Sequence, residues 1–238
     1  MSDMSSTTEA VIATRGLTRI LSDPLPVTLV EDVDLEVRRG EFVAITGPSG
    51  SGKSSLLYLL GLLDLPTRGS VSLEGRDTSR LPPRELTRLR LTKLGFVFQF
   101  HFLLPEFTVL ENLMIPMRKL GRLGDAAMRE RARGLLAELG MESEAKKTPD
   151  QLSGGQSQRA AIARALANEP LVVLADEPTG NLDSKNAHNV FFIFRRLAEE
   201  RGQAVITVTH DPHLAEHTHR QLHIVDGRLV PADAAMGA

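Results

Sequence analysis

A glycine-rich octapeptide, GPSGSGKS at residues 47–54, limits the possible folds of this chain more than any other feature. It matches the pattern G-x-x-x-x-G-K-[ST] and follows a short apolar segment, residues 41–46, that predicts a buried strand. An apolar helix is predicted after it, from about Ser54 to Leu63. A strand, a glycine-rich turn and a helix in this order bind phosphate, because backbone amides and the positive helix end attract anions. The sequence therefore predicts an α/β domain that binds a nucleotide.

Each residue type in the octapeptide suits contact with a phosphate chain. Glycines allow positive φ values and a close approach of the backbone. Lys53 can reach the β- and γ-phosphates, and Ser54 can ligate Mg²⁺. The alternative, a glycine–serine turn with a surface lysine, does not explain the strand before it and the helix after it. The residues expected at the nucleotide are Gly47, Pro48, Ser49, Gly50, Ser51, Gly52, Lys53, Ser54 and Ser55.

An acidic pair ends a second apolar run, LVVLADEP at residues 171–178, which is typical of a central parallel strand. Asp176 can hold Mg²⁺ through water, and Glu177 can polarise a water molecule that attacks the γ-phosphate. The alternative is a pair of acids that cap a turn before Pro178. The phosphate loop elsewhere in the chain favours the hydrolytic interpretation.

The order of predicted elements indicates an α/β fold with a mainly parallel core sheet, an antiparallel β edge and an inserted helical subdomain. Strands alternate with helices outside residues 108–152, where the pattern is helical, and residues 221–230 predict a hairpin with an Asp-Gly turn. Asp125 is the expected N-cap of one helix in the insertion. We expect a disordered tail (1–8) and a single domain (9–238), in which a core (9–98 and 158–238) carries the helical subdomain (about 99–157).

Composition excludes several classes of function. The net charge of −2 leaves no electrostatic footprint for nucleic acid, although it is compatible with a local basic patch. The absence of cysteine rules out disulfides and thiolate metal sites. The polar N-terminus does not resemble a signal peptide. The longest apolar stretch, residues 56–65, is shorter than the roughly 20 residues that span a bilayer. We therefore expect a soluble, cytoplasmic chain.

A second potential anion site lies about a hundred residues after the phosphate loop, in LSGGQ at residues 152–156. Ser153 can cap the helix that follows, and Gly154 and Gly155 leave amides open at its N-terminus.

Several motifs occur in one order that resembles the ATP-binding subunits of ABC transporters over nearly the whole chain. They are the phosphate loop, Gln99, LSGGQ with Ser153, Gly154, Gly155 and Gln156, LADEP, NLD and His210. The resemblance implies a P-loop ATPase that uses ATP and Mg²⁺ and pairs head to tail, so that each LSGGQ closes over the nucleotide of the other chain. It implies that Gln99 senses the γ-phosphate and Mg²⁺, that Asp183 links the two active sites, and that His210 contacts the γ-phosphate. Without the resemblance, His210 would be interpreted as a turn residue. The implied catalytic residues are Lys53, Gln99, Glu177 and His210, and the implied metal-binding residues are Ser54, Gln99 and Asp176.

The family resemblance also leads to an expectation about the adenine. The family usually stacks an N-terminal aromatic residue on adenine, whereas this chain offers Ile20 or Leu21 for apolar contact.

His213 and His217 could share one helix face and hold a metal ion, but no further ligand completes such a site, and a solvated helix is the favoured interpretation.

Aromatic residues cluster in FVFQFHFLLPEF, residues 96–107, which contains five of the nine phenylalanines. The alternation of Phe96, Phe98, Phe100 and Phe102 predicts a strand at the start, with Phe96 and Phe98 facing the core. The rest is too apolar for a loop that meets only water, which indicates a partner site. By the family resemblance, this surface receives a short helix of a membrane subunit; the alternative is a satellite core under the helical lobe. The proposed docking residues are Phe100, Phe102, Leu103, Leu104 and Phe107.

The segment at residues 99–117 resembles the ATPases of lipoprotein-releasing (LolCDE) systems, which extract lipoproteins from the inner membrane of Gram-negative bacteria. The resemblance implies two LolC/LolE-like permeases, a position on the cytoplasmic face of the inner membrane, and membrane contact only through those permeases. ADEPTGNLD, residues 175–183, also fits MacB-like efflux and FtsE-like cell-wall-regulating relatives. A soluble ABC ATPase that acts on nucleic acid or ribosomes is a further alternative, although such proteins tend to carry two domains of this kind or a long coiled-coil insertion.

Overall fold

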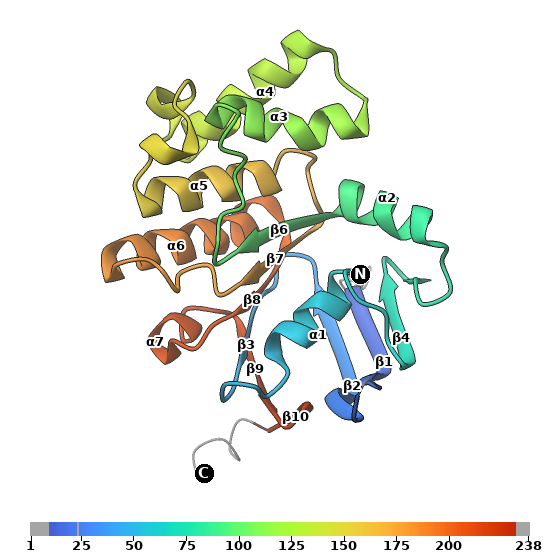
Figure 1. The fold of residues 1–238 in the computed structure, drawn as a ribbon. Helices are drawn as coiled ribbons and strands as arrows, with labels where there is room; N and C mark the ends of the chain where they lie inside the picture. Colours follow the sequence, from blue (N-terminus) through green and yellow to red (C-terminus); the bar gives the residue numbers. More distant parts are fainter. Residues whose placement is uncertain (1–9, 23, 232–238) are drawn as a thin grey trace, which may run out of the picture.

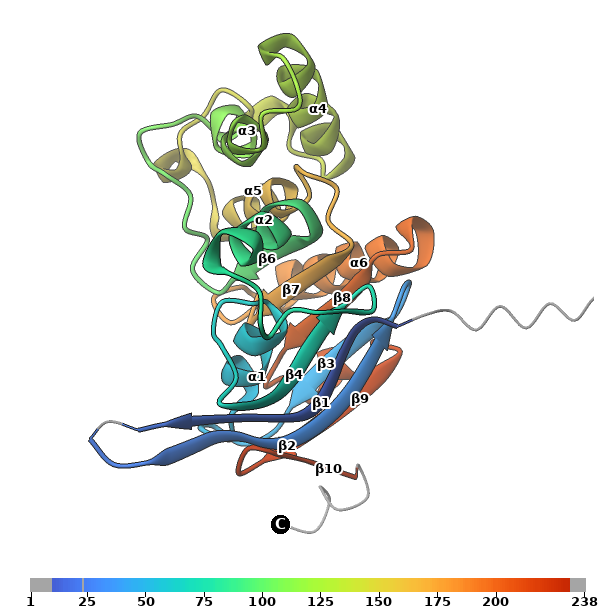
Figure 2. The same cartoon turned by 90° about the vertical axis from the view of Figure 1, so that its right-hand side faces the viewer.

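The computed structural model describes residues 10–22 and 24–231, which form two β-sheets and a group of helices (Figure 1). The tail expected at residues 1–8 lies outside the described residues. Figures 1 and 2 show a helical lobe at one end of the molecule and a small antiparallel sheet at the other.

A six-stranded core sheet carries the functional loops. Its strands lie in the order β10-β9-β3-β8-β7-β6, and all neighbours are parallel except the β9–β10 hairpin. Strands β3, β7 and β8 are almost fully buried, as their continuous apolar sequences predict. The expected mainly parallel sheet is confirmed. The strands are β3 (Phe42–Thr46), β6 (Leu94–Phe98), β7 (Val172–Asp176), β8 (Ala204–Val208), β9 (Arg220–Val225) and β10 (Arg228–Val230).

The antiparallel strands form a sheet of their own, in the order β2-β1-β4-β5. Residues 33–38 of β2 alternate between buried and exposed positions, as a strand with one covered face requires. Helix α1 (Lys53–Leu60) packs between this sheet and the core sheet in one apolar cluster. The strands are β1 (Ala10–Leu21), β2 (Val27–Arg38), β4 (Arg68–Leu73) and β5 (Arg76–Asp77).

Helices α5 and α6 pack against the other face of the core sheet and against the lobe. One apolar cluster joins Phe42 and Val205 of the sheet to residues of α3, α4, α5 and α6, so the lobe and the sheet share a core. Helix α2 precedes β6 at the sheet edge (Figure 1). The helices are α2 (Pro83–Lys93), α3 (Val109–Leu120), α4 (Asp125–Glu138), α5 (Gly154–Ala165), α6 (Ser184–Arg201) and α7 (Pro212–Ala215), with short 3-10 turns at Glu142–Glu144 and Pro149–Gln151.

Several local predictions need correction. Helix α1 ends at Leu60 rather than Leu63, because Gly61 is its C-cap and Leu62 has a positive φ of 56°. Gly124, not Asp125, is the N-cap of α4, and the Asp125 carboxylate pairs with Arg129 one turn later instead. Helix α7 ends at Ala215, so His217 lies outside the helix that was expected to carry it.

The phenylalanine strand is shorter than its alternation predicts. Strand β6 ends at Phe98, and Phe102 has a φ of 47°, which no strand accommodates. Val97 is the fully buried residue, whereas Phe96 and Phe98 stack on the opposite side at 6.1 Å and are only partly buried. The core therefore takes the residue between the two phenylalanines, although Phe96 also packs against the cluster around α1.

Within the described part of the chain, no helix has both the length and the apolar character that crossing a membrane requires.

Candidate nucleotide-binding site

The glycine-rich loop joins β3 to α1 and requires glycine at two positions where neighbouring backbone lies very close. Gly47 (φ 141°) and Gly52 (φ 101°) would place a Cβ atom 2.1 Å from the carbonyl oxygens of Ile224 and Leu29, respectively. Gly50 also has a positive φ (78°), but open space surrounds it. Strands β9 and β2 thus hold the loop in a backbone conformation that side chains would prevent.

Lys53 is the first residue of α1, and its side chain is buried inside the loop. Its ammonium group donates to the carbonyl oxygens of Gly47 (3.0 Å) and Pro48 (2.6 Å). The nearby Ser51 hydroxyl is buried and has no hydrogen-bond partner among the described residues. The loop therefore holds one buried cation and one unpartnered polar group, which an anionic ligand would satisfy.

Asp176, the last residue of β7, accepts hydrogen bonds from two hydroxyl groups of α1. Ser54 donates to Oδ1 at 2.8 Å, and Tyr58 donates to Oδ2 at 2.7 Å. The two donors are four residues apart and share one helix face, which is the pattern that could have indicated this pairing from the sequence. Tyr58 was not among the predicted site residues. Its hydroxyl fixes the orientation of the carboxylate, as partners of metal-binding groups commonly do.

The pKa of Tyr58 should show this contact directly. Burial, followed by the hydrogen bond to Asp176 and the charge of that carboxylate, raises its pKa from 10.0 to about 12. A raised folded-state pKa stabilises the fold fully below pH about 10, and this contribution is lost as the pH rises through about 12.

Because the chain contains one tyrosine and no tryptophan, the near-ultraviolet absorbance of tyrosinate reports Tyr58 alone. We expect a titration midpoint near 12, and a lower midpoint in Asp176→Asn. Far-ultraviolet circular dichroism, recorded in parallel, shows whether the chain is still folded at each pH. A midpoint near the ordinary value in folded protein would contradict the contact.

Glu177 and His210 meet because their strands are parallel neighbours. Asp176 pairs with Val208 in the β7–β8 register, so the residues that follow each strand emerge side by side. His210 Nδ1 lies 3.4 Å from Glu177 Oε2. Glu177 has a positive φ of 45°, a strained conformation that concentrates at functional sites. The structure therefore brings together the predicted base and the predicted γ-phosphate contact.

Gln99 follows the next strand at the same edge. Phe98 of β6 pairs with Asp176, which places Gln99 beside the segment after β7. The Gln99 amide lies 3.4 Å from Asn181 Oδ1, and a Cβ atom on Gly180 would lie 2.8 Å from the same nitrogen. Gln99, Asp176, Glu177 and His210 thus line up at the carboxyl ends of β6, β7 and β8, the edge where ligands bind in open α/β sheets.

The LSGGQ segment forms the N-terminus of α5. Ser153 and Gln156 make a reciprocal capping box, and Gln156 also donates to Glu144 (3.2 Å). Gly155 is tightly packed, since a Cβ atom there would lie 2.5 Å from Asn186 Oδ1. In both views α5 lies in the lobe half of the molecule, apart from α1 (Figures 1 and 2). The structure does not bring Ser153–Gln156 to the phosphate loop of the same chain.

Asp183 caps α6, directly beside this segment. Its carboxylate accepts from the Asn186 backbone amide (2.9 Å) and side chain (2.7 Å), and the backbone bond is the main cause of its lowered pKa. Asn186 thus connects the Asp183 cap to Gly155. Sequence reasoning missed this asparagine, because its role depends on two segments that meet only in the fold.

An exposed loop follows Gln99. We call residues 100–107 the phenylalanine loop. Phe100 and Phe102 are 64% and 63% exposed, and Leu104 and Phe107 are also exposed. Leu103 differs from the prediction, because it packs against the lobe core instead. Arg164 of α5 donates to the carbonyl oxygens of His101 (2.8 Å) and Phe102 (2.5 Å), so the apolar side chains stand on a fixed backbone.

Asn112 is the second anchor of this loop, and it is fully buried. It accepts from the Leu104 amide (2.8 Å) and donates to the carbonyl oxygens of Leu104, Phe107 and Thr108 at 3.0–3.1 Å. Asn112→Ala should lower the free energy of unfolding by roughly 3 kcal/mol, because it removes four hydrogen bonds between a buried side chain and partly buried backbone groups. Urea denaturation would measure this loss.

Glu106→Ala, an exposed change in the same loop, is the control for Asn112→Ala and should alter stability little. Asn112→Asp should be at least as unstable as the alanine variant, because it places a charge against three carbonyl oxygens. A wild-type unfolding curve for Asn112→Ala would show that the loop does not depend on this anchor.

An apolar groove of about 490 Å³ lies next to the phenylalanine loop. It runs between α2 and α3, over β6 and α5. Its apolar lining includes Leu63, Leu91, Phe96, Phe98, Ile115 and Pro116.

Among the described residues, no cluster of three or more histidines and acids could hold a metal ion. His188 and His217 lie edge to face at 6.2 Å, without a third ligand in the described chain.

These features define a class of protein: a P-loop ATPase whose acidic pair, glutamine and histidine share one sheet edge with the phosphate loop, and whose LSGGQ helix lies apart from that loop. The family model described as "ABC transporter" matches residues 30–180, and the chain belongs to this family.

Similar proteins indicate a subgroup within this family. The chain is 52% identical to the lipoprotein-releasing system ATP-binding protein LolD 1 of Chlorobium chlorochromatii, over 88% of this chain and 85% of that protein. It is 53% identical to the LolD protein of Aquifex aeolicus, over 85% and 89% of the two chains. Among solved structures, the ATP-binding cassette MJ0796, as a post-hydrolysis dimer bound to ADP and Pi, superimposes with a TM-score of 0.86 at 40% identity, covering 92% of this chain and 97% of that one. Within the family, this chain groups with lipoprotein-releasing ATP-binding proteins, and it is an ATPase.

Proposed function

We propose that this chain hydrolyses ATP to power the release of lipoproteins from the bacterial inner membrane toward the outer membrane, as a peripheral subunit on the cytoplasmic face. The names of the relatives support lipoproteins as the cargo and a lipoprotein-releasing system as the complex. The observation that carries the proposal is the exposed phenylalanine loop, which continues directly from Gln99 at the nucleotide site. A partner on this loop would be coupled to the state of the nucleotide.

Two copies of the chain complete two nucleotide sites in this proposal. The separation of α5 from α1 within one chain supports it, because the amides at Gly154 and Gly155 then need a nucleotide held by another copy (Figures 1 and 2). A structural relative described as dimeric supports the same arrangement. Asp183, which stands beside the LSGGQ helix through Asn186, would lie at the contact between the copies.

The donor set at the sheet edge fits Mg²⁺. The Ser54 hydroxyl and the Asp176 carboxylate already adjoin, both carry the oxygen ligands that this ion prefers, and Gln99 lies along the same edge. When bound, Mg²⁺ would neutralise charge on the phosphates.

The side chains of this chain divide the remaining work. Lys53 and the loop amides hold the phosphates, Glu177 accepts a proton from the attacking water, and His210 contacts the γ-phosphate. The 3.4 Å approach of His210 to Glu177 would keep both groups aligned. Ile20 and Leu21, at the end of β1, offer apolar surface for the adenine, and Leu21 is 40% exposed.

The phenylalanine loop and the apolar groove form the proposed docking site for a helix of a membrane subunit. Phe100, Phe102, Leu104 and Phe107 present the exposed side chains, and Leu103 anchors the loop from below. The groove provides the concave, apolar surface that a short amphipathic helix fits.

Purification from native membranes tests the function. The Glu177→Gln chain is purified with ATP from detergent-solubilised membranes, and its partners are identified by mass spectrometry. We expect two related permeases together with lipoproteins. Phe102→Asp and Leu104→Asp should lose the permeases while they bind nucleotide normally. Phe192→Asp, which changes a 68% exposed phenylalanine of α6, is the matched control and should retain them.

Other outcomes redirect the proposal. Recovery of one permease with an efflux channel or with regulators of cell-wall hydrolases would point to a MacB-like or FtsE-like system. Recovery of no membrane protein would refute a transporter subunit. Wild-type recovery of permeases by both loop variants would refute the docking site alone.

A further inference from the structure

A hollow of about 710 Å³ lies between α2 and the end of α3, and positive side chains surround it. Its remaining lining consists of proline, threonine and leucine, without an acidic residue. We call its four cations the basic belt: Arg84, Arg88, Lys119 and Arg122.

The basic belt is exposed, and its charges are not neutralised within the described chain. None of its four side chains forms an ion pair with another residue in the ranges 10–22 and 24–231, where sixteen such pairs are found.

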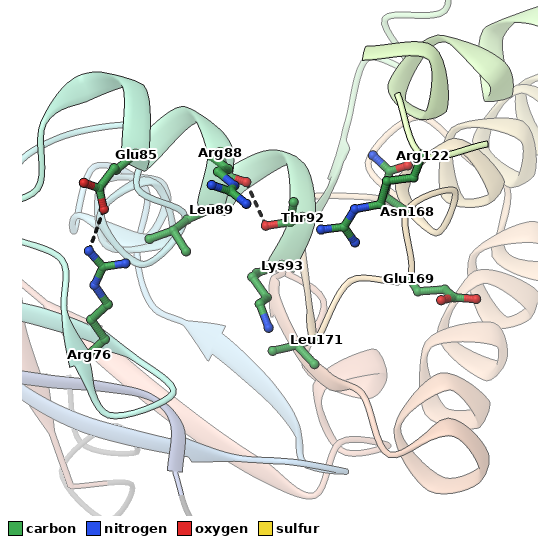
Figure 3. A pocket seen from close by; sticks show the side chains of 10 residues that line it. All are labelled: Arg76, Glu85, Arg88, Leu89, Thr92, Lys93, Arg122, Asn168, Glu169 and Leu171. Carbon is green, nitrogen blue, oxygen red and sulfur yellow. Dashed lines mark hydrogen bonds and ion pairs between the residues drawn. The ribbon is translucent and has the colours of Figure 1, made fainter. Parts of the chain in front are cut away.

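The adjoining hollow, drawn in Figure 3, is also lined by Arg88 and Arg122 of the belt, but its other cations are paired. There Arg76 pairs with Glu85 at 2.5 Å, Lys93 pairs with Glu74 and Glu169 pairs with Arg131. An unpaired cluster therefore is not a general property of this surface.

The segments around the belt concentrate positive charge. Residues 76–93 and 118–122 together contain nine cations and two acids. Glu74 and Asp125 pair with Lys93 and Arg118 of these segments, which leaves a net charge of +5 in a chain whose total is −2. Such a local field attracts an extended anionic surface even though the whole chain is slightly acidic.

The belt also has a defined orientation relative to the proposed docking site. Its hollow shares Thr87, Leu91 and Lys119 with the apolar groove. If the groove holds a helix of a membrane subunit, the belt faces the same side, next to the membrane. This step rests on the proposed function.

The chemistry of the hollow favours lipid over the other anionic partners. Cytoplasmic segments of membrane proteins carry an excess of Lys and Arg, so a permease segment is a poor source of several acids. The hollow has no aromatic side chain on which a nucleic-acid base could stack. The cytoplasmic leaflet, in contrast, is an anionic surface that attracts clusters of exposed Lys and Arg.

We propose that the basic belt contacts anionic phospholipid headgroups beside the membrane subunit. The membrane contact of the chain is then direct as well as through its permeases, which extends the expectation drawn from the sequence.

Vesicle flotation of the full chain tests this proposal. The probes are vesicles of phosphatidylcholine alone and vesicles that also contain phosphatidylglycerol, at physiological salt. Each cation at an anionic surface contributes roughly fivefold to the partition coefficient. Replacing all four belt residues with glutamine should therefore lower binding to the anionic vesicles about a hundredfold or more. Added salt should weaken the wild-type binding, because the charges are exposed.

The matched control changes four other exposed cations to glutamine: Arg38, Arg68, Arg133 and Lys146. These also lack ion pairs within the described residues, so the net charge changes equally. We expect this control to bind anionic vesicles nearly as well as the wild type.

Several results would overturn the proposal. Equal losses in the two variants would indicate attraction by net charge alone. Wild-type chain that binds both vesicle types equally, or neither, would exclude recognition of anionic lipid. A belt variant that floats normally but loses the permeases in the membrane purification would assign the belt to an acidic polypeptide. Recovery of no permease by wild-type chain, with the flotation result intact, would refute the proposed function and leave the lipid contact standing.

Discussion

Replacing Glu177 with glutamine is expected to lower ATP turnover by about a hundredfold or more, the range that a general base contributes. Glutamine keeps the size and the hydrogen-bonding of the side chain but cannot accept the proton of the attacking water. The strained backbone at this residue and the neighbouring His210 Nδ1 hold the side chain at the sheet edge, so the substitution should remove the chemistry and little else. Phosphate release in steady state measures the effect.

Binding should survive this substitution. Lys53, the loop amides and Asp176 are unchanged, so ATP should bind with near wild-type affinity, and a dimer with trapped ATP should appear in size-exclusion chromatography. Glu216→Gln, an exposed acid just after α7, is the control and should hydrolyse ATP normally. Hydrolysis by Glu177→Gln near the wild-type rate would show that another group acts as the base.

Gly52→Ala should be far more damaging than Gly50→Ala, although both glycines have positive φ values in the same loop. A Cβ atom in this backbone region costs roughly 1–2 kcal/mol at either position. At Gly52 that atom would also lie 2.1 Å from the Leu29 carbonyl oxygen, whereas nothing lies within 4 Å of it at Gly50. The forced shift adds roughly 1–3 kcal/mol, as overpacking does elsewhere.

Urea denaturation without nucleotide separates the two glycine variants. Gly52→Ala should also lose ATP affinity by about tenfold or more, equivalent to roughly 1.4 kcal/mol, because the N-terminus of α1 and Lys53 move with it. Equal unfolding curves for the two variants would mean that the contact between the loop and β2 does not determine the loop conformation.

Much of the site was predictable from the sequence, because short motifs encode it locally. The loop at residues 47–54 requires glycine spacing, a preceding strand and a following helix, and all three are contiguous in the chain. The alignment of Gln99, Asp176 and His210 also follows from sequence, since each ends or follows a strand and parallel strands end at one edge.

Positions that depend on contacts between distant segments were not predictable in this way. The alternation of phenylalanines suggested that Phe96 and Phe98 face the core. Val97 is fully buried instead, and Phe96 and Phe98 are only partly buried, because α2 and α3 leave one side of β6 only partly covered; Phe96 also packs against the cluster around α1. In the sequence, Leu103 is one apolar residue among several. It anchors the loop because it packs against the lobe core, a contact that only the fold creates. Tyr58 shares a helix face with Ser54, but only the fold places Asp176 opposite both hydroxyl groups. Asn112 lies among the apolar residues of α3, and only the fold places the phenylalanine loop against it.

The sequence by itself determined the fold class, the phosphate loop, the acidic pair and the family, because each depends on residue types at fixed local spacing. Tertiary structure decided which hydroxyls hold Asp176, which side chains anchor the phenylalanine loop, and where the positive charges of α2 and α3 meet. These features join residues far apart in the chain through distances of a few ångströms, and a linear pattern does not encode such distances.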